Sequence, residues 1–286
     1  MPVQPVAHSK MRALLEKIRK RQSTQTESDT KAIAAILGRT YRDVIVEVAE
    51  WEGTDTPTAA MMLGQLNALR DRLQGDLKAA TQAILTQWDG SWKAHWESGA
   101  EAGMAGLEGA DVSLLLYQVA SDTSVITATA QYVPHLIADV TPEALGRITR
   151  AVRNGIILQQ PKMMVYTGIK SALLGSPTRL ARRRFGGLAY QVERIYRTEA
   201  HQLYNQGCDA AGRAAEAHLH VKLVKVWRHG PPNKLSRPDH VALDGEVRKL
   251  TEKFSNGLAY PGDPSGAPED VINCTCWMDV VPADSV

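Results

Sequence analysis

Hydrophobic residues recur every three or four positions through most of the first 220 residues of the chain. The spacing is clearest from Ala32 to Val48, from Met61 to Leu85 and around Val152, and it is broken at 53–57 and 159–161. Because side chains three and four residues apart share one face of a helix, the pattern predicts a bundle of amphipathic helices.

Proline, glycine and tryptophan positions refine this helical prediction. Thr141-Pro142-Glu143 combines a capping residue, a first-turn proline and an early acid, which predicts that a helix starts there. A glycine cluster predicts a hinge or a close helix crossing: Gly99, Gly103, Gly106 and Gly109. Tryptophans spaced by four predict a packed seam rather than a base-stacking platform: Trp88, Trp92 and Trp96.

After His220 the period changes from helical to extended. Residues 221–227 are rich in β-branched and aromatic side chains, Pro238 begins a short helix, and Asp244-Gly245 turns the chain into 247–250. A closing strand is expected over 276–281. The fold class is therefore α+β and mostly α: an N-terminal helical bundle or arm, then a long helix packed on a small C-terminal β-containing module.

Length and composition narrow the protein class. The chain has 286 residues, 44% of them hydrophobic, and a net charge of +2, so it can bury a core and its overall charge does not identify a partner. No run approaches the roughly 18 to 20 apolar residues of a membrane helix, so we expect no span, no signal peptide and no membrane partner. An odd count of 3 cysteines favours thiols or metal ligation over a disulfide scaffold.

Two basic segments are candidates for contact with a partner. Residues 8–21 place apolar side chains on one helical face and crowd cations around it, and a second basic run follows further along the chain. Solvated helix faces and non-specific contacts with DNA phosphates both fit such clusters. The residues concerned are Lys17, Arg19, Lys20, Arg21, Arg182, Arg183 and Arg184.

The helix expected from about 188 to 218 carries a carboxylate on its apolar face. Glu199 lies four residues after Ile195 and four before Leu203, where an unpaired charge is costly. Arg197 is two residues away and faces elsewhere, so Arg237 is the preferred partner. We predict a buried structural ion pair between Glu199 and Arg237.

The last third of the chain resembles the C-terminal module of the phage Mu protein F-like minor capsid (head morphogenesis) family. The resemblance lies in the order of several short motifs: Arg197-Thr198-Glu199, Trp227, Arg237-Pro238-Asp239-His240, Leu243-Asp244-Gly245, Tyr260-Pro261-Gly262-Asp263-Pro264 and Asn273-Cys274-Thr275-Cys276. It implies a helical region over 1–177, containing a contact arm, and a Mu F-like module over 178–286.

The resemblance also implies a function and a location. Members of the family associate with the portal protein and with capsid and scaffold proteins of a tailed phage. The expected location is inside the head at the portal vertex, after synthesis in the host cytoplasm, with a role in procapsid assembly or genome delivery. The expected protein is not an enzyme.

His240, Cys274 and Cys276 are the candidate metal ligands. Thiolates and an imidazole suit zinc, although Cys-x-Cys is a weaker signal than Cys-x-x-Cys. Many relatives carry Cys-x-x-Cys after the arginine and a later His-Pro-x-Cys-Arg-Cys; here Val271 replaces that later histidine and Thr275 the arginine. Structural zinc, reduced structural thiols, and a disulfide or reactive thiol all remain open. The fourth-ligand candidates are Asp239, His229 and Asp263. We predict that the three side chains converge.

Two other classes of function use the same residues. One is a non-enzymatic nucleic-acid-binding module. The other is an effector enzyme: a hydrolase built from Cys274 or Cys276 with His240 and Asn273, or a metal-dependent nuclease built from His229, His240 and Asp244. Neither spacing is diagnostic, and the chain has no glycine-rich phosphate loop, His-Glu-x-x-His helix or serine nucleophile elbow.

Overall fold

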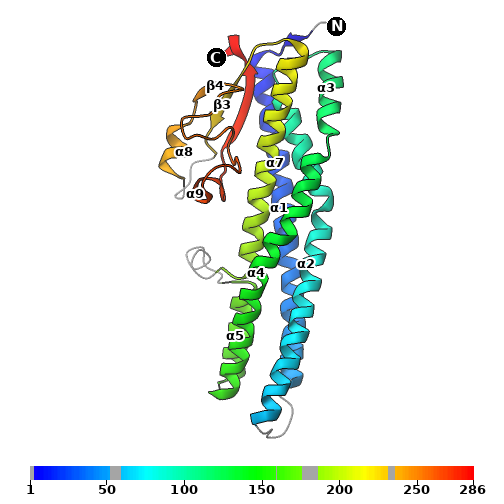
Figure 1. Ribbon diagram of the computed structural model, residues 1–286, viewed down its shortest axis with the longest axis vertical. Helices are drawn as coiled ribbons and strands as arrows, with labels where there is room; N and C mark the ends of the chain where they lie inside the picture. Colours follow the sequence, from blue (N-terminus) through cyan, green and yellow to red (C-terminus); the bar gives the residue numbers. More distant parts are fainter. Residues whose placement is uncertain (1–2, 52–58, 159, 176–185, 231–235) are drawn as a thin grey trace. The chain divides into compact units, whose positions relative to one another are not determined.

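The computed structural model describes residues 3–51, 59–158, 160–175, 186–230 and 236–286 (Figure 1). The chain divides into two compact units, each discontinuous in sequence. We call the first the sheet unit (1–27, 89–131 and 196–286) and the second the helical unit (28–88 and 132–195). The domain boundary predicted between residues 177 and 178 lies outside the described residues.

Long helices make up most of the described chain. They are α1 (His8–Trp51), α2 (Ala59–Gly103), α3 (Ala110–Ala120), α4 (Ser124–Ile157), α5 (Lys162–Leu173) and α7 (Leu188–Leu219). Short helical turns follow in the sheet unit: α8 (Pro238–Ala242), α9 (Pro268–Val271) and the 3-10 turn η1 (Ala283–Ser285). No described helix is long and apolar enough to cross a membrane.

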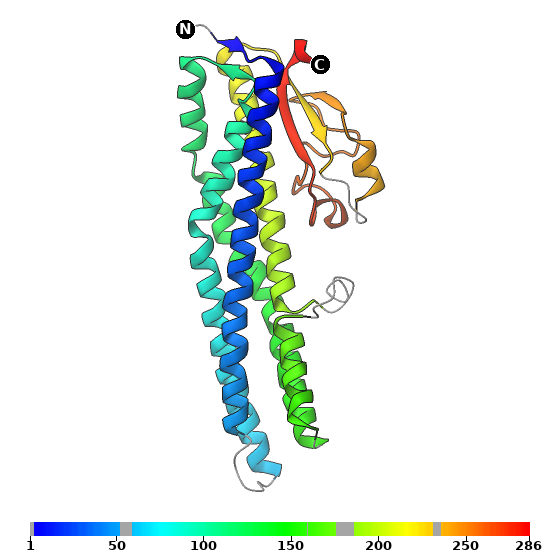
Figure 2. The ribbon, with the colours of Figure 1, turned by 180° about the vertical axis from the view of Figure 1, so that it is seen from behind.

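The strands belong to the sheet unit. β3 (Leu223–Arg228) lies between β4 (Val247–Lys249) and β5 (Trp277–Pro282), antiparallel to both, so Val226 faces Val247 on one side and Asp279 on the other. A second pair joins β1 (Gln4–Pro5) to β2 (Leu107–Glu108). The predicted α+β, mostly α fold is confirmed (Figure 2).

The helix start predicted at Thr141 is wrong, because α4 continues through both Pro134 and Pro142. The Thr141 hydroxyl donates to the Ile137 carbonyl at 2.8 Å, one turn back, instead of capping a new helix. Ile137 and Ile148 are both fully buried. Their packing on either side of Pro142 holds the helix together across the hydrogen bond that the proline cannot make.

The basic segment 8–21 is not a free arm. It forms the start of α1, and its apolar stripe of Met11, Leu15 and Ile18 is 3%, 3% and 1% exposed within the core of the sheet unit. The apolar stripe of this segment is therefore covered by the protein's own core and is not available to a partner. Periodicity shows that a helix has an apolar face, but it does not show whether the face packs on its own chain or on a partner.

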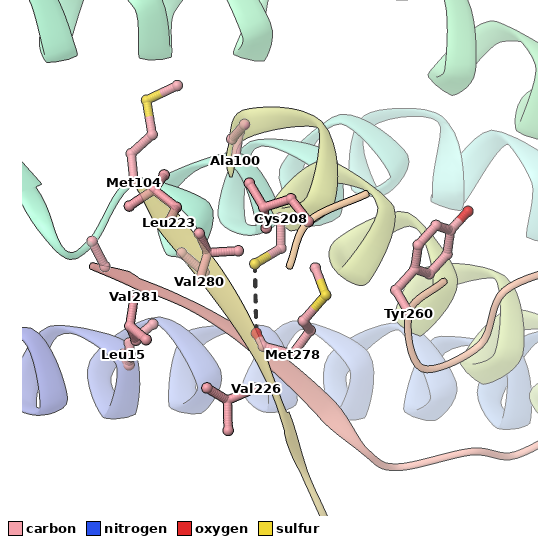
Figure 3. Packing of buried hydrophobic residues seen from close by; sticks show 14 of the residues in the cluster. Leu15, Ala100, Met104, Cys208, Leu223, Val226, Tyr260, Met278, Val280 and Val281 are labelled. Carbon is pink, nitrogen blue, oxygen red and sulfur yellow. Dashed lines mark hydrogen bonds between the residues drawn. The ribbon is translucent and has the colours of Figure 1, made fainter. Parts of the chain in front are cut away.

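One hydrophobic core joins the sheet to the helices of the sheet unit (Figure 3). Cys208 of α7 donates its thiol hydrogen to the Met278 carbonyl of β5 at 3.5 Å. Close by, the methyl groups of Val280 would lie 3.0 and 3.1 Å from a Cβ placed on Gly212. The sheet thus packs on α7 at close range.

Glycines bring α2 and α7 into backbone contact on another part of α7. A Cβ added to Gly99 would lie 2.0 Å from the Tyr204 carbonyl oxygen, and one added to Gly103 would lie 2.4 Å from that of Cys208. From the α7 side, a Cβ on Gly207 would lie 2.7 Å from the Trp96 carbonyl oxygen. These contacts confirm the close helix crossing predicted from the glycine cluster. Trp88, Trp92 and Trp96 are buried, as the seam prediction requires.

Gly99→Ala should destabilise the protein by about 2 kcal/mol or more, because its methyl group cannot avoid a backbone atom without moving a helix. Gly90 provides the matched control, since it is exposed in the same helix with nothing within 4 Å of an added Cβ. Gly90→Ala should raise stability by about 0.5 to 1 kcal/mol. Urea denaturation followed by circular dichroism measures both. Equal unfolding midpoints for the two variants would contradict the close crossing.

Candidate metal centre

A row of polar side chains on α7 positions the segment that carries the two cysteines. Thr198, His201, Asn205 and Cys208 are separated by three, four and three residues, so they share one face of the helix. All four bond to the main chain of residues 273–278. We call them the polar row of α7.

The bonds of the polar row are made in register along the segment. The Thr198 hydroxyl accepts from the Asn273 N–H at 3.1 Å, and the His201 Nε2 bonds the Cys276 carbonyl. Asn205 donates to the same carbonyl at 3.3 Å and accepts from the Met278 N–H at 3.0 Å. With the main chain fixed on this side, the cysteine side chains are fixed as well.

Asn273 enters this segment in a left-handed conformation, with φ of 57°. Asparagine tolerates that region better than most residues, because its short polar side chain can bond locally. The turn between α9 and β5 therefore depends on this residue type, and Thr198 bonds the same residue's N–H.

His240 reaches the cysteines from α8. Pro238 starts that helix in its first turn, and the chain then turns at Gly245, where φ is 86° and the N–H bonds the Trp227 carbonyl at 2.9 Å. Asp244 accepts from the His229 N–H at 2.9 Å, which ties the turn to the end of β3. The Trp227 ring meets the imidazole of His240 edge-on, with centroids 5.5 Å apart.

The three predicted ligands converge. The Nδ1 atom of His240 lies 3.5 Å from the sulfur of Cys274 and 3.5 Å from that of Cys276. The residues are 3%, 4% and 2% exposed, and their ligand atoms all lie within 4.8 Å of one another. This buried group can hold a metal ion.

The distances suit a tetrahedral ion. Zn–S bonds of about 2.3 Å and Zn–N bonds of about 2.0 to 2.1 Å give an N···S edge of about 3.5 Å, which matches the separations of His240 Nδ1 from both sulfurs. The other ring nitrogen, Nε2, is buried without a hydrogen bond and lies 4.0 Å from a carboxylate oxygen of Asp270. A carboxylate on the far ring nitrogen is the usual support of a metal-bound imidazole.

The two sulfurs form a pair that shares one charge. The Cys274 thiol donates to Cys276, which lowers the pKa of Cys276 and raises the pKa of Cys274. A hydrogen bond from the Gly230 N–H lowers the pKa of Cys276 further, despite its burial. One thiolate at neutral pH is the form of cysteine that ligates metals.

None of the proposed fourth ligands joins the group within the described part of the chain. Asp239 is exposed on α8. Asp263 accepts from the N–H groups of Ala259 and Ser265 at 2.8 and 2.9 Å, so its carboxylate holds its own loop. The described residues therefore supply three ligands, which leaves one tetrahedral position for water or another donor.

The predicted ion pair between Glu199 and Arg237 is wrong. Arg237 donates to the Ile272 carbonyl instead, and no described cation lies within salt-bridge distance of Glu199. Burial alone raises the pKa of Glu199 to about 7. Sequence reasoning placed the carboxylate on the packing face correctly, but it overlooked that a half-buried acid can bind a proton in place of a cation.

The cations predicted to contact a partner differ in whether they form ion pairs within the sheet unit. Arg19 pairs with Asp279 and Arg21 with Glu101, so both are used inside the sheet unit. Lys17 and Lys20 are exposed on α1. Arg182, Arg183 and Arg184 lie outside the described residues.

Sequence reasoning missed a buried lysine. Lys225 of β3 is 0% exposed, and its ammonium donates to the carbonyls of Ala259 at 2.7 Å and Leu250 at 3.3 Å. It also lies over the Phe254 ring at 5.2 Å. Burial lowers its pKa. The lysine anchors the loop after β4 to the sheet. Its position in the middle of a strand of β-branched residues is the sequence feature that could have predicted its burial.

Of the two residue sets considered for an enzyme, the hydrolase set brings its histidine and cysteines together and the nuclease set does not. His240 does meet both cysteines, but all three side chains are almost fully buried. In the nuclease set, Asp244 bonds the main chain of His229 and is not part of the His240 group.

Comparison with protein-family models, with curated proteins and with solved structures finds no match. The family resemblance therefore rests on the motif residues themselves and on how they are arranged.

Glu199→Gln should make the protein more stable above neutral pH. The folded-state pKa of about 7 exceeds the ordinary 4.5, so wild-type stability falls as the pH rises from about 4.5 and levels off above about 7. Glutamine does not ionise, so the variant should gain about 1 to 3 kcal/mol at pH 8, allowing for partial exposure.

Thermal unfolding of both proteins across this pH range measures the effect. Glu16→Gln, at an exposed position of α1, should unfold as the wild type does at every pH. Parallel stability profiles for wild type and Glu199→Gln would show that Glu199 is paired and that the raised pKa is wrong.

Proposed function

We propose that the chain is a minor capsid protein of a tailed phage, associated with the portal inside the head and acting in procapsid assembly or genome delivery. The observation that carries the proposal is the convergence of the motifs that resemble the Mu F-like family. Those motifs are spread from residue 197 to residue 276, all within the sheet unit, and several of them are linked by hydrogen bonds or ring contacts.

Specific bonds link the motifs. Thr198 of the Arg-Thr-Glu motif bonds Asn273, the residue before Cys274. Gly245 bonds Trp227, and the Trp227 ring contacts His240. These contacts place the linked motifs in one folded unit, which is the arrangement that the resemblance implies for a C-terminal module.

We further propose that the metal held by His240, Cys274 and Cys276 is zinc in a structural role. Sulfur and imidazole donors select zinc over the hard cations, and the site lies where the chain returns after about thirty residues of turns. An ion there would link α8 to the start of β5. Its free energy of binding would add to the stability of the module.

Burial favours this structural role over catalysis. A nucleophilic thiolate or a hydrolytic metal must meet a substrate, but Cys276 and His240 are 2% and 3% exposed. The alternative of a nucleic-acid-binding module retains Lys17 and Lys20, whose side chains are exposed and can contact phosphates.

Portal association is testable by co-purification. Portal rings isolated from cells that make the portal, scaffold and capsid proteins of the same phage should retain this chain. If the basic face of α1 makes the contact, Lys17→Glu with Lys20→Glu should weaken retention, while Lys78→Glu, an exposed lysine of α2, should not. Rings that never carry the wild-type chain would reject the proposed function.

Zinc content tests the metal. Purified wild-type protein should contain about one equivalent, and chelation should lower its melting temperature. Cys276→Ser and His240→Ala should lose the metal. Cys208→Ser is the matched control, because Cys208 is equally buried but bonds Met278 and is not in the group. Less than about a tenth of an equivalent in unchelated wild type would reject zinc.

A further inference from the structure

The end of the hairpin formed by α4 and α5 exposes four large aliphatic side chains. Ile157, Leu158, Met163 and Met164 are 62%, 63%, 72% and 58% exposed. They flank the turn between the two helices, and Figure 1 shows α5 running back along the end of α4. We call these four residues the apolar tip.

Main-chain hydrogen bonds hold the described residues on both sides of the apolar tip. The Leu158 N–H bonds the Asn154 carbonyl at 2.9 Å, the Gln160 N–H bonds that of Gly155 at 3.0 Å, and the Met164 N–H bonds that of Pro161 at 2.8 Å. Leu158 and Met164, two of the four exposed residues, are therefore each held by a main-chain hydrogen bond. Single exposed apolar residues are common, but four at one turn are not.

The hairpin cannot absorb these side chains into its own interface. A Cβ on Gly155 would lie 2.4 Å from Val165, and one on Gly168 would lie 2.8 Å from the Ala151 side chain. Val152, Val165 and Ile169 already fill the seam between the helices and are almost fully buried. The hairpin therefore leaves the four side chains of the tip uncovered.

The charged residues near the apolar tip indicate which kind of partner the tip binds. The sequence has no acid between Glu143 and Glu193. Arg150, Arg153 and Lys170 are exposed on the two helices behind the tip. Arg153 is one turn before Ile157, and Arg150 and Lys170 lie about 10 Å behind the tip at 1.5 Å per residue.

We infer that the apolar tip inserts into the surface of a bilayer that contains anionic lipids. Interfacial segments bury apolar side chains about 5 to 10 Å deep, and cations at that distance behind the tip meet the lipid phosphates. An outward-pointing tip fits a fluid surface, whereas a protein partner would need a matching acidic groove. The absence of a spanning helix, from which no membrane partner was expected, does not bear on surface binding.

Vesicle binding by the full chain tests the inference. Wild type should co-sediment with vesicles of phosphatidylcholine mixed with phosphatidylglycerol, and only weakly with phosphatidylcholine alone. Met163→Ser with Met164→Ser should reduce binding at least about tenfold, because two side chains lose their apolar contact. Arg150→Glu with Arg153→Glu should reduce it by a similar factor.

The controls separate the tip from general stickiness. Leu114→Ser removes a side chain of similar exposure, 59%, from α3 and should bind as wild type does. All substituted residues are exposed, so circular dichroism should show unchanged folding. No wild-type binding, or equal binding by the tip variant, would overturn the inference. Loss of portal retention on the tip substitutions without any vesicle binding would instead make the tip a protein-docking site. Portal association and lipid binding can each fail without the other.

Discussion

The hydrogen bonds between the polar row of α7 and the main chain of residues 273–278 determine where the cysteines lie. An extended segment at the edge of a loop has no intrinsic reason to adopt one position, because its main-chain groups can be satisfied by water. Here Thr198, His201 and Asn205 satisfy them instead. The sulfur atoms then meet His240 because the main chain beneath them cannot shift.

The polar row can hold residues 273–278 in place only because α7 is itself held in place by its contact with α2. Gly99 and Gly103 allow the α2 backbone to approach α7 so closely that no side chain separates them. A helix held by contacts between main chains has little freedom to slide or rotate. Burial also lowers the pKa of His201, so the group that bonds the Cys276 carbonyl at neutral pH is an uncharged imidazole.

The sequence predicted the elements better than it predicted their partners. The strands β3, β4 and β5, the helix from 188 to 219, the glycine crossing and the convergence of His240 with the cysteines all follow from periodicity, turn residues and ligand chemistry. The short pair of β1 and β2 was not predicted. The continuous helix through Pro142 and the buried start of α1 do not, because tertiary packing decided both. The same holds for Glu199: its place on the packing face could be read from spacing, whereas its partner required coordinates.

The cations of this chain show why net charge says little about function. The net charge of +2 does not distinguish cations that form ion pairs within the protein from cations that are exposed. Arg19 and Arg21 look like a basic patch in the sequence, yet acids on β5 and α2 neutralise them, so they stabilise the sheet unit. The stretch between Glu143 and Glu193 contains no acid of its own. Arg147 in this stretch donates to the main-chain carbonyls of Gly186 and Ser171, whereas Arg150 and Arg153 are exposed. An exposed cation can contact a partner, and Arg150 and Arg153 lie on the helix that ends at the exposed side chains of the apolar tip.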